Sequence, residues 1–362
     1  MHSKKSVRTF TSIMILAISM MMVLAACGGN ENQQANKESN EGAASSGHEL
    51  ADKRIALVMQ QNLGTFSSQY IEGVREQVEA FGGELTVLDA NTDLARMASN
   101  LDSAVTQRFD GILIDHGTAE ALQQGVEKAL EKEIPVVAFD AQVDVPGVPV
   151  LEQNDQKMAE ATLNSLGEEL EGKGNIVKIW VAGFAPMERR QESYAAFLEA
   201  NPGINELASF GNATQNTALD TQAQMAALLK QYPEGEIDAV WAAWDEFAKG
   251  AARAIAEAGR TEIRVYGIDI SDEDLQMIQD PSNPWVATAA VNPTDIGKVQ
   301  VRYLYQKMHG DEVDDQIILN PVFVHRDMLS EEPVTTGNLS EYVEEWGNND
   351  QGYKDWMKDL EQ

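Results

Sequence analysis

The sequence predicts an α/β protein made of two doubly wound lobes, each built on a parallel sheet. From residue 54 onward, short runs rich in Val, Ile and Leu alternate with longer amphipathic segments, and this alternation pauses near Asn154 before it resumes. Continuous apolar runs separated by helices are typical of parallel strands that are covered on both faces. Repeated strand–helix–strand units form a doubly wound sheet. About 310 residues follow the N-terminal segments, more than one core usually holds, so two lobes are expected.

The elements follow in order along the chain. The first amphipathic segment shows the pattern clearly, because Ile71, Val74, Val78 and Phe81 share one helical face before Gly82 ends the helix. We expect strands at 54–59, 84–88, 111–114, 134–139, 176–181, 207–210, 237–241 and 263–268. We expect helices at 68–81, 93–108, 118–132, 188–200, 217–231 and 246–258. The acidic residues after Asn338 predict a helical C-terminal appendage to which no chemistry is assigned.

The N-terminus predicts the compartment. Basic residues precede an apolar run, 13–24, that has the length of a signal peptide and is too short to span a bilayer comfortably. The run ends in LAACG, which resembles a bacterial lipobox, and Cys27 is the only cysteine of the chain. A plain secretory signal with an incidental cysteine is the alternative. We predict that Cys27 is lipidated, because two acyl chains make a stable anchor. Residues 27–52 would then form a flexible tether, since 30–47 contain no Val, Ile, Leu or aromatic residue.

The charge excludes one class of partner. The formal net charge is −31, and removal of the three cations among residues 1–26 would leave −34. Such a chain repels nucleic acid and anionic lipid, so nucleic-acid binding is excluded and membrane contact is expected through the lipid anchor only. We expect a monomer located outside the cytoplasm, on the outer face of the cell membrane.

Candidate ligand-binding residues lie where the predicted strands end. In open parallel sheets, ligands bind beyond the carboxyl ends of the strands. The polar and aromatic residues at those positions are Gln60, Gln61, Phe66, Asp115, Asp140, Gln142, Met187, Arg189, Arg190, Trp244, Asp245, Asp269 and Asn292. Carboxylates accept hydrogen bonds from hydroxyls, Arg donates a fork of them, and an aromatic face covers the C–H face of a ring. These residue types therefore favour a neutral polyhydroxyl ligand over a phosphorylated one.

Each candidate has a structural alternative. Asp140 could cap the next turn, and Asp269 could cap the helix that begins near Ser271. Trp244 could belong to the core. Arg189 and Arg190 are adjacent, so we expect one of them to be a solvated surface charge.

Several segments in the same order resemble the ribose-type, sugar-binding branch of the periplasmic-binding-protein superfamily. The segments are IPVVAFD at 134–140, Arg190 ahead of Tyr194, PGI at 202–204, WDE at 244–246 with Gly250, YGID at 266–269, and ATAAV at 287–291 with IG at 296–297. The similarity covers about 54–324. It implies a type I fold with three hinge segments: lobe one at 53–154 plus 292–321, lobe two at 155–291 plus 322–336, and the appendage at 337–362.

The resemblance also implies roles for individual residues. Phe66 would stack on a ligand ring, while Asp140, Arg190 and Asp269 would bond its hydroxyls, and Gln60 and Asp115 join the candidate set. Ribose binders carry other polar or aromatic residues at the positions of Gly64, Ser67, Ala141, Trp244 and Val291. Their stacking Phe of the second lobe aligns near Asn216 of this chain. The family role therefore carries over, but ribose as the ligand does not.

The implied function is capture of a small sugar or polyol for an ABC importer, with no cofactor and no metal. Nucleotide-binding, hydrolase and zinc-protease motifs are absent from the sequence, so we expect no enzyme activity. A glycosidase is disfavoured because Arg190 would keep neighbouring carboxylates ionised. A sugar-responsive repressor is excluded by the lipobox and acidic tether. A receptor subunit that feeds a membrane kinase or quorum-type system remains the alternative.

Overall fold

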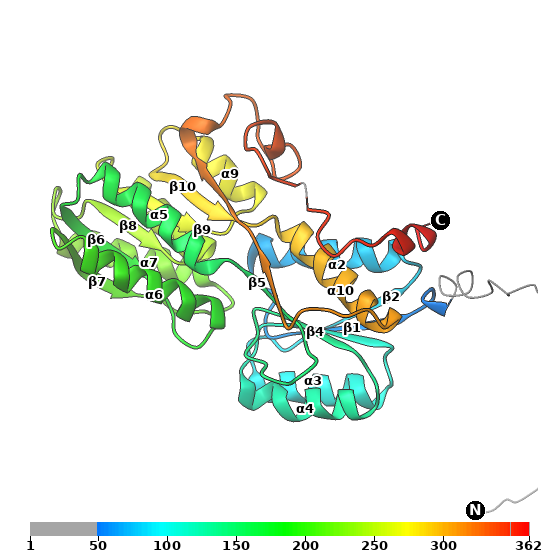
Figure 1. The fold of residues 1–362 in the computed structure, drawn as a ribbon. Coiled ribbons are helices and arrows are strands. Elements are labelled where there is room, and N and C mark those ends of the chain that lie inside the picture. Colours follow the sequence, from blue (N-terminus) through cyan, green and yellow to red (C-terminus); the bar gives the residue numbers. More distant parts are fainter. Residues whose placement is uncertain (1–48, 348, 362) are drawn as a thin grey trace, which may run out of the picture. The chain divides into compact units, whose positions relative to one another are not determined.

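The computed structural model describes residues 49–347 and 349–361. The predicted signal peptide, Cys27 and most of the tether therefore lie outside the described residues. Figure 1 shows two sheets flanked by helices, as the alternation of short apolar and longer amphipathic segments predicts.

The first sheet has the strand order β11-β5-β4-β3-β1-β2, with parallel neighbours throughout. Its strands are β1 (Arg54–Met59), β2 (Glu84–Asp89), β3 (Gly111–Asp115), β4 (Val136–Phe139), β5 (Val150–Gln153) and β11 (Gln316–Leu319). Its helices are α2 (Gly64–Ala80), α3 (Leu94–Thr106), α4 (Ala119–Glu131) and α10 (Pro293–His309). Side chains alternate along a strand, so Leu57 packs in the core that includes α2 and α10, while Val58 packs in the core under α3 and α4.

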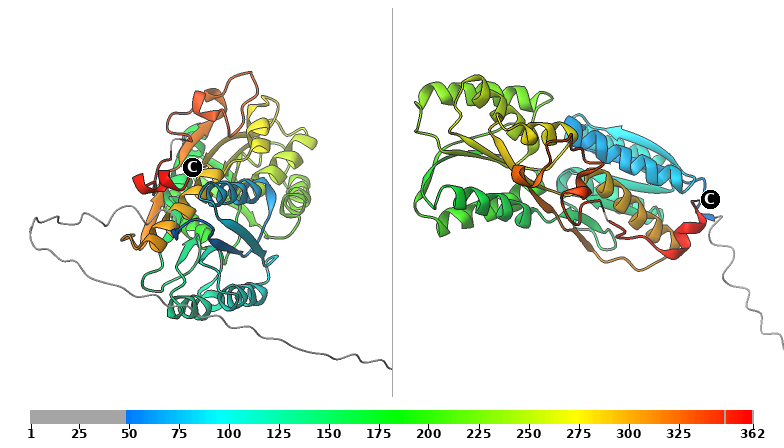
Figure 2. Two further views of the ribbon diagram at one scale, coloured as in Figure 1. Left: turned by 90° about the vertical axis from the view of Figure 1, so that its right-hand side faces the viewer. Right: turned by 90° about the horizontal axis from the view of Figure 1, so that it is seen from above.

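The helices α2 and α10 lie side by side, as Figure 2 shows in a view from above. Glycines make this close approach possible. A Cβ on Gly73 would lie 2.0 Å from the carbonyl oxygen of Thr294, and a Cβ on Gly297 would lie 2.4 Å from that of Tyr70. Since real side chains cannot approach backbone atoms so closely, only glycine fits at these two positions.

The second sheet has the strand order β12-β10-β9-β8-β6-β7. Its strands are β6 (Gly174–Ile179), β7 (Ile204–Phe210), β8 (Ala239–Ala242), β9 (Arg264–Ile268), β10 (Trp285–Ala290) and β12 (Val322–His325). Its helices are α5 (Asp155–Glu169), α6 (Ala185–Ala200), α7 (Thr217–Gln231), α8 (Asp245–Glu257) and α9 (Asp272–Gln279). Only β12 at the sheet edge runs antiparallel to its neighbour, β10. The predicted pair of doubly wound, mainly parallel sheets is therefore confirmed.

The chain passes between the two sheets three times before its C-terminal segment. It passes to the second sheet after β5 and returns to the first sheet after β10, where α10 follows. It passes to the second sheet again between β11 and β12. These passages bring the carboxyl ends of strands from both sheets to one cavity, described below.

Two expectations about elements are wrong. The first helix begins at Gly64 rather than near Ser68, so Phe66 lies in its first turn and not in a loop. The expected C-terminal helix is a series of turns with the 3₁₀ helices η2 (Leu339–Glu341) and η3 (Asp355–Asp359). Positive φ angles at Glu345, Gly347 and Gly352 prevent a continuous helix.

The C-terminal segment packs against both halves of the fold. Val343 and Trp346 are buried in a cluster with residues of α9, β10 and β12, whereas Met357 and Leu360 are buried in the cluster of α2 and α10. Arg302 of α10 donates to backbone carbonyls of this segment. Among the described residues, no helix is both long and apolar enough to cross a membrane.

Candidate functional site

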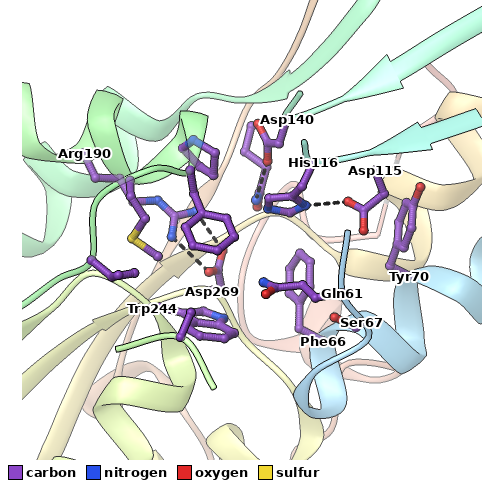
Figure 3. Close-up of a pocket in the computed structure, with 16 residues that line it drawn as sticks. Gln61, Phe66, Ser67, Tyr70, Asp115, His116, Asp140, Arg190, Trp244 and Asp269 are labelled. Carbon is purple, nitrogen blue, oxygen red and sulfur yellow. Dashed lines mark hydrogen bonds and ion pairs between the residues drawn. The ribbon is translucent and has the colours of Figure 1, made fainter. Parts of the chain in front are cut away.

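A cavity lies where the carboxyl ends of strands from both sheets meet, as Figure 3 shows. It leaves about 40 Å³ for the centres of water-sized molecules, and part of the cavity is open to solvent. From the first sheet side it is lined by Gln61, Phe66, Ser67, Tyr70, Asp115, His116, Asp140 and Gln153. From the second sheet side it is lined by Val181, Phe184, Pro186, Met187, Arg190, Ala213, Trp244 and Asp269.

Arg190 of α6 is the central charged group of the cavity wall. Its side chain is only 2% exposed, and it donates from Nε to Asp155 at 2.7 Å and from Nη1 to the carbonyl of Ala243 at 2.7 Å. Its two terminal nitrogens form a fork on Asp269, with distances of 3.1 and 3.2 Å. Despite burial, Asp269 and Asp155 raise the pKa of Arg190, so the guanidinium stays charged. This fork fixes the Asp269 carboxylate at the cavity wall.

The neighbouring Arg189 is not the solvated surface charge that we expected from the pair. Its side chain is 17% exposed, and its guanidinium forms ion pairs with Asp140, Glu152 and Asp155. Asp140 and Glu152 belong to the first sheet, whereas Arg189 lies on α6 beside the second sheet. The expectation is wrong because Arg189 has three carboxylates in reach, which no strand-end pattern could indicate.

Asp140 and Asp269 each follow a strand with left-handed backbone geometry, at φ of 48° and 72°. This conformation is rare for residues with a Cβ and turns the side chain out of the strand direction. Burial, together with the charge of Asp155, raises the pKa of Asp140 to about 7, against the opposing effect of Arg189. Burial also raises the pKa of Asp269, although the Arg190 fork opposes this. Neither residue caps a helix: Ser271, not Asp269, accepts the hydrogen bond at the start of α9.

His116 follows β3 and contacts groups from both sheets. Its Nδ1 lies 2.7 Å from Oδ1 of Asp115, and its ring meets the ring of Phe184 edge-on with centroids 6.1 Å apart. Burial disfavours the charged ring, but the Asp115 carboxylate outweighs that effect and raises the pKa of His116. The imidazole is therefore a polar group at the cavity that can change its charge near neutral pH.

Two buried amide oxygens of the lining lack a partner. Oε1 of Gln61 and Oε1 of Gln153 have no hydrogen-bond partner among the described residues. A buried polar atom without a partner is costly, so such atoms indicate where a ligand or water would donate. Aromatic faces complete the wall: Phe66 and Trp244 both line the cavity (Figure 3), and Trp244 also packs edge-on against Phe247.

Eight of the strand-end candidates line the cavity: Gln61, Phe66, Asp115, Asp140, Met187, Arg190, Trp244 and Asp269. The other five, Gln60, Gln142, Arg189, Asp245 and Asn292, do not. Gln60 lies outside the lining, whereas its neighbour Gln61 contacts the cavity. Asn216, the residue near the stacking Phe of ribose binders, is exposed at the start of α7 and does not line the cavity. The described residues contain no group of His, Cys, Asp and Glu that could hold a metal ion.

Comparison with known proteins identifies the family. A sequence model of the family described as periplasmic binding protein domain matches residues 55–312, which is more than half of the chain. The chain belongs to the periplasmic binding protein family. The resemblance to the ribose-type branch is confirmed by the relatives below, and this family consists of extracytoplasmic binding proteins rather than enzymes.

Three relatives of this periplasmic binding protein illustrate the branch. A xylitol-binding protein of Mycolicibacterium smegmatis is 29% identical over 67% of this chain and 68% of its own length. A ribose import binding protein of Bacillus subtilis is 27% identical over 84% of this chain and 94% of its own. A 5-methylthioribose transporter solute binding protein from Thermotoga lettingae, solved with 5-methylthioribose, is 34% identical, with a TM-score of 0.82 over 85% of this chain and 98% of its own.

Several lining residues of this periplasmic binding protein were missed from the sequence. His116 directly follows Asp115 at the end of β3, so the strand-end rule that selected Asp115 could also have selected it. Gln153 ends β5, a strand of four residues that the sequence pattern did not reveal. Ser67 and Tyr70 lie in the first turns of α2, which was expected to begin later. Phe184 and Ala213 carry no polar group and gave no signal.

Proposed function

We propose that this protein is the solute-binding component of an ABC importer and that it captures a small sugar or polyol in the cavity between its two sheets. The observation that carries the proposal is the composition of the cavity wall. Buried carboxylates, a buried Arg190 and two unpaired amide oxygens surround a space that aromatic rings also border. The ligands named for the relatives, xylitol, ribose and 5-methylthioribose, belong to this chemical class.

Ligand hydroxyl groups would donate hydrogen bonds to the acceptor atoms of the cavity wall that have no partner. The unpaired oxygens of Gln61 and Gln153 can each accept a hydrogen bond from a ligand hydroxyl. Asp140 and Asp269 can accept further ones, since each carboxylate oxygen has more than one lone pair. Phe66 and Trp244 would cover the C–H faces of a ring. A ligand that lacks one of these hydroxyls would leave a buried group unpaired, which costs about 1–3 kcal/mol and gives selectivity.

Binding would couple to closure of two lobes. We propose that lobe one comprises residues 53–154 plus 292–321 and lobe two residues 155–291 plus 322–336, with 337–362 as an appendage. Phe66 and Asp140 belong to the first, and Arg190, Trp244 and Asp269 to the second. A ligand that contacts residues of both lobes stabilises the closed arrangement, since only there can it make all of these contacts. A ligand shifts the equilibrium between open and closed forms only through such differences in contact.

We further propose that the mature protein begins at Cys27 and is held on the outer face of the membrane by lipid on that residue, with 27–52 as its tether. A Cys27→Ser variant should appear in the growth medium, and membrane fractionation with an antibody would measure this. Retention of the variant in the membrane fraction at the level of the unchanged protein would contradict the anchor.

A thermal-shift screen against sugars and polyols tests the binding function. A ligand at a hundredfold excess over its dissociation constant stabilises the protein by about 2.7 kcal/mol, so a true ligand stands out. The same hit should stabilise a variant in the cavity, Asp269→Asn, much less. Absence of any stabilising sugar or polyol, across pentoses, hexoses and their alcohols, would contradict the proposal.

A further inference from the structure

The cavity wall changes character along the second sheet. In the order of strands, Asp269 follows β9 and Trp244 follows β8, whereas the segments after β6 and the edge strand β7 contribute apolar residues. We call the following set the β6–β7 subsite: Val181, Phe184, Pro186, Met187 and Ala213. None of these five side chains can donate or accept a conventional hydrogen bond.

The β6–β7 subsite is held in place by its own loop. The indole Nε1 of Trp180 donates to the carbonyl of Met187 at 2.8 Å, and the backbone N–H of Gly183 donates to Glu188 at 2.9 Å. The ring of Phe184 rests edge-on against His116 from the first sheet. These contacts hold the loop between β6 and α6, and with it the backbone that carries Phe184 and Met187, beside the cavity.

The polar groups lie elsewhere on the wall. Gln61, Asp115, Asp140 and Gln153 end or follow strands of the first sheet. Arg190 donates most of its hydrogen bonds to Asp155, Ala243 and Asp269. A hydroxyl pointed at the β6–β7 subsite would therefore be buried with no partner from that subsite, at a cost in free energy. A short apolar group there would instead remove apolar surface from water.

We propose that the ligand is a pentose-sized sugar with a short apolar substituent, and that the substituent occupies the β6–β7 subsite while the hydroxyls face the first sheet and the Arg190–Asp269 pair. This inference names the substrate class within the proposed function and rests on it. A methylthio group fits the chemistry well, because thioethers pack favourably against methionine and against aromatic edges such as that of Phe184.

Three pentoses separate the substituent from every other feature of the sugar. The probes are ribose, 5-deoxyribose and 5-methylthioribose, titrated calorimetrically into the full-length protein purified in detergent. The last two lack the C5 hydroxyl and cannot close to a six-membered ring, so they differ only in the methylthio group. We expect 5-methylthioribose to bind at least tenfold more tightly than 5-deoxyribose.

A polar replacement in the subsite tests where the substituent lies. Met187→Gln keeps the length of the side chain but adds an amide, and it should reduce the affinity ratio of 5-methylthioribose to 5-deoxyribose several-fold. The matched control is Met328→Gln, at a methionine that is 41% exposed and outside the cavity, and it should leave the ratio unchanged. Val181→Thr, nearly isosteric, provides a second subsite variant if Met187→Gln does not fold, as judged by circular dichroism.

The possible outcomes test the apolar subsite and the sugar-binding function separately. A tenfold or larger ratio that falls in the subsite variants but not in the control supports the inference. Equal affinities for 5-deoxyribose and 5-methylthioribose, or a ratio that the subsite variants do not change, overturn it while sugar binding stands. If none of the three pentoses binds and no other sugar or polyol does, the proposed function fails together with the inference.

Discussion

The affinity of the cavity for its ligand should depend on pH through Asp140. In the protein without ligand, burial and the charge of Asp155 raise the pKa of this carboxyl to about 7, although Arg189, His116 and Arg190 oppose the shift. A sugar hydroxyl that donates to Asp140 forms a stronger hydrogen bond with the ionised carboxylate than with the protonated acid. Binding therefore favours loss of the proton, and affinity should rise as the pH rises through 7.

The magnitude follows from the fraction of Asp140 that is ionised. With a pKa of about 7, roughly 1% of the carboxyl is ionised at pH 5, about 10% at pH 6 and about 90% at pH 8. If only the ionised form binds well, the association constant should fall about tenfold from pH 8 to pH 6 and by nearly two orders of magnitude at pH 5. Titration calorimetry at these values, in two buffers of different ionisation enthalpy, would also count the released proton.

The folding stability of the ligand-free protein should depend on pH in the opposite direction to ligand affinity. The folded pKa lies above the ordinary value of 3.8, so the folded state keeps a proton that the unfolded chain releases. The stabilising contribution of this carboxyl is complete below about pH 4 and is lost as the pH rises through 7. The ligand-free protein should thus lose this contribution progressively between about pH 4 and pH 7, and ligand affinity increases over the upper part of that range.

The variant Asp140→Asn isolates the effect. It should flatten the dependence of affinity on pH, and any slope that remains would belong to His116, whose pKa is also raised. A constant affinity between pH 5 and 8 in the unchanged protein would refute the reasoning. An undiminished slope in Asp140→Asn would show that another group carries it.

Three further predictions follow from individual contacts. Asp269→Asn should weaken ligand binding by about 10- to 100-fold in calorimetry, since hydrogen bonds to charged groups contribute about 1.5–3 kcal/mol. Gly64→Ala should weaken binding about tenfold, because a Cβ there would lie 2.4 Å from Oε1 of Glu246 on α8 and φ is 71°. Met357→Ala should lower the melting temperature by at least about 4 °C, since truncating a fully buried methionine costs about 2–5 kcal/mol.

Matched controls distinguish these effects from general damage. Asp355→Asn changes the same residue type at an exposed position and should leave ligand affinity as it was. Removing the obstructing side chain with Glu246→Gly should restore part of the affinity lost in Gly64→Ala. Met328→Ala, at a methionine 41% exposed, should barely change the melting temperature. Equal effects in a variant and its control would contradict the corresponding contact.

More of the fold than of the candidate site could be predicted from the sequence. Strands such as 54–59 and 111–115 are continuous apolar runs whose burial on both faces leaves a clear pattern, and their carboxyl ends placed Asp115 correctly. The strand β5 was missed, because it has only four residues and two of them are the polar Glu152 and Gln153. The helix predicted from the acidic residues after Asn338 did not form as expected, because glycines and positive φ angles break the C-terminal segment into turns.

The site depends on contacts between residues distant in sequence. Arg189 could not be distinguished from a surface charge, because its partners Asp140 and Asp155 lie 49 and 34 positions away. The difference between Gln60 and Gln61 depends on which side chain of a strand end turns toward the cavity. Periodicity cannot settle that choice where the strand stops. The apolar β6–β7 subsite has no polar signature at all, so only the assembled wall reveals it.

The electron density of a co-crystallised sugar tests the central claim most directly. The protein should be crystallised with the best ligand of the screen. The account predicts a sugar between Phe66 and Trp244, with hydroxyls within hydrogen-bond distance of Gln61 or Gln153 and of Asp140 or Asp269. A sugar bound at any other place on the protein, with the cavity filled only by water, would contradict it.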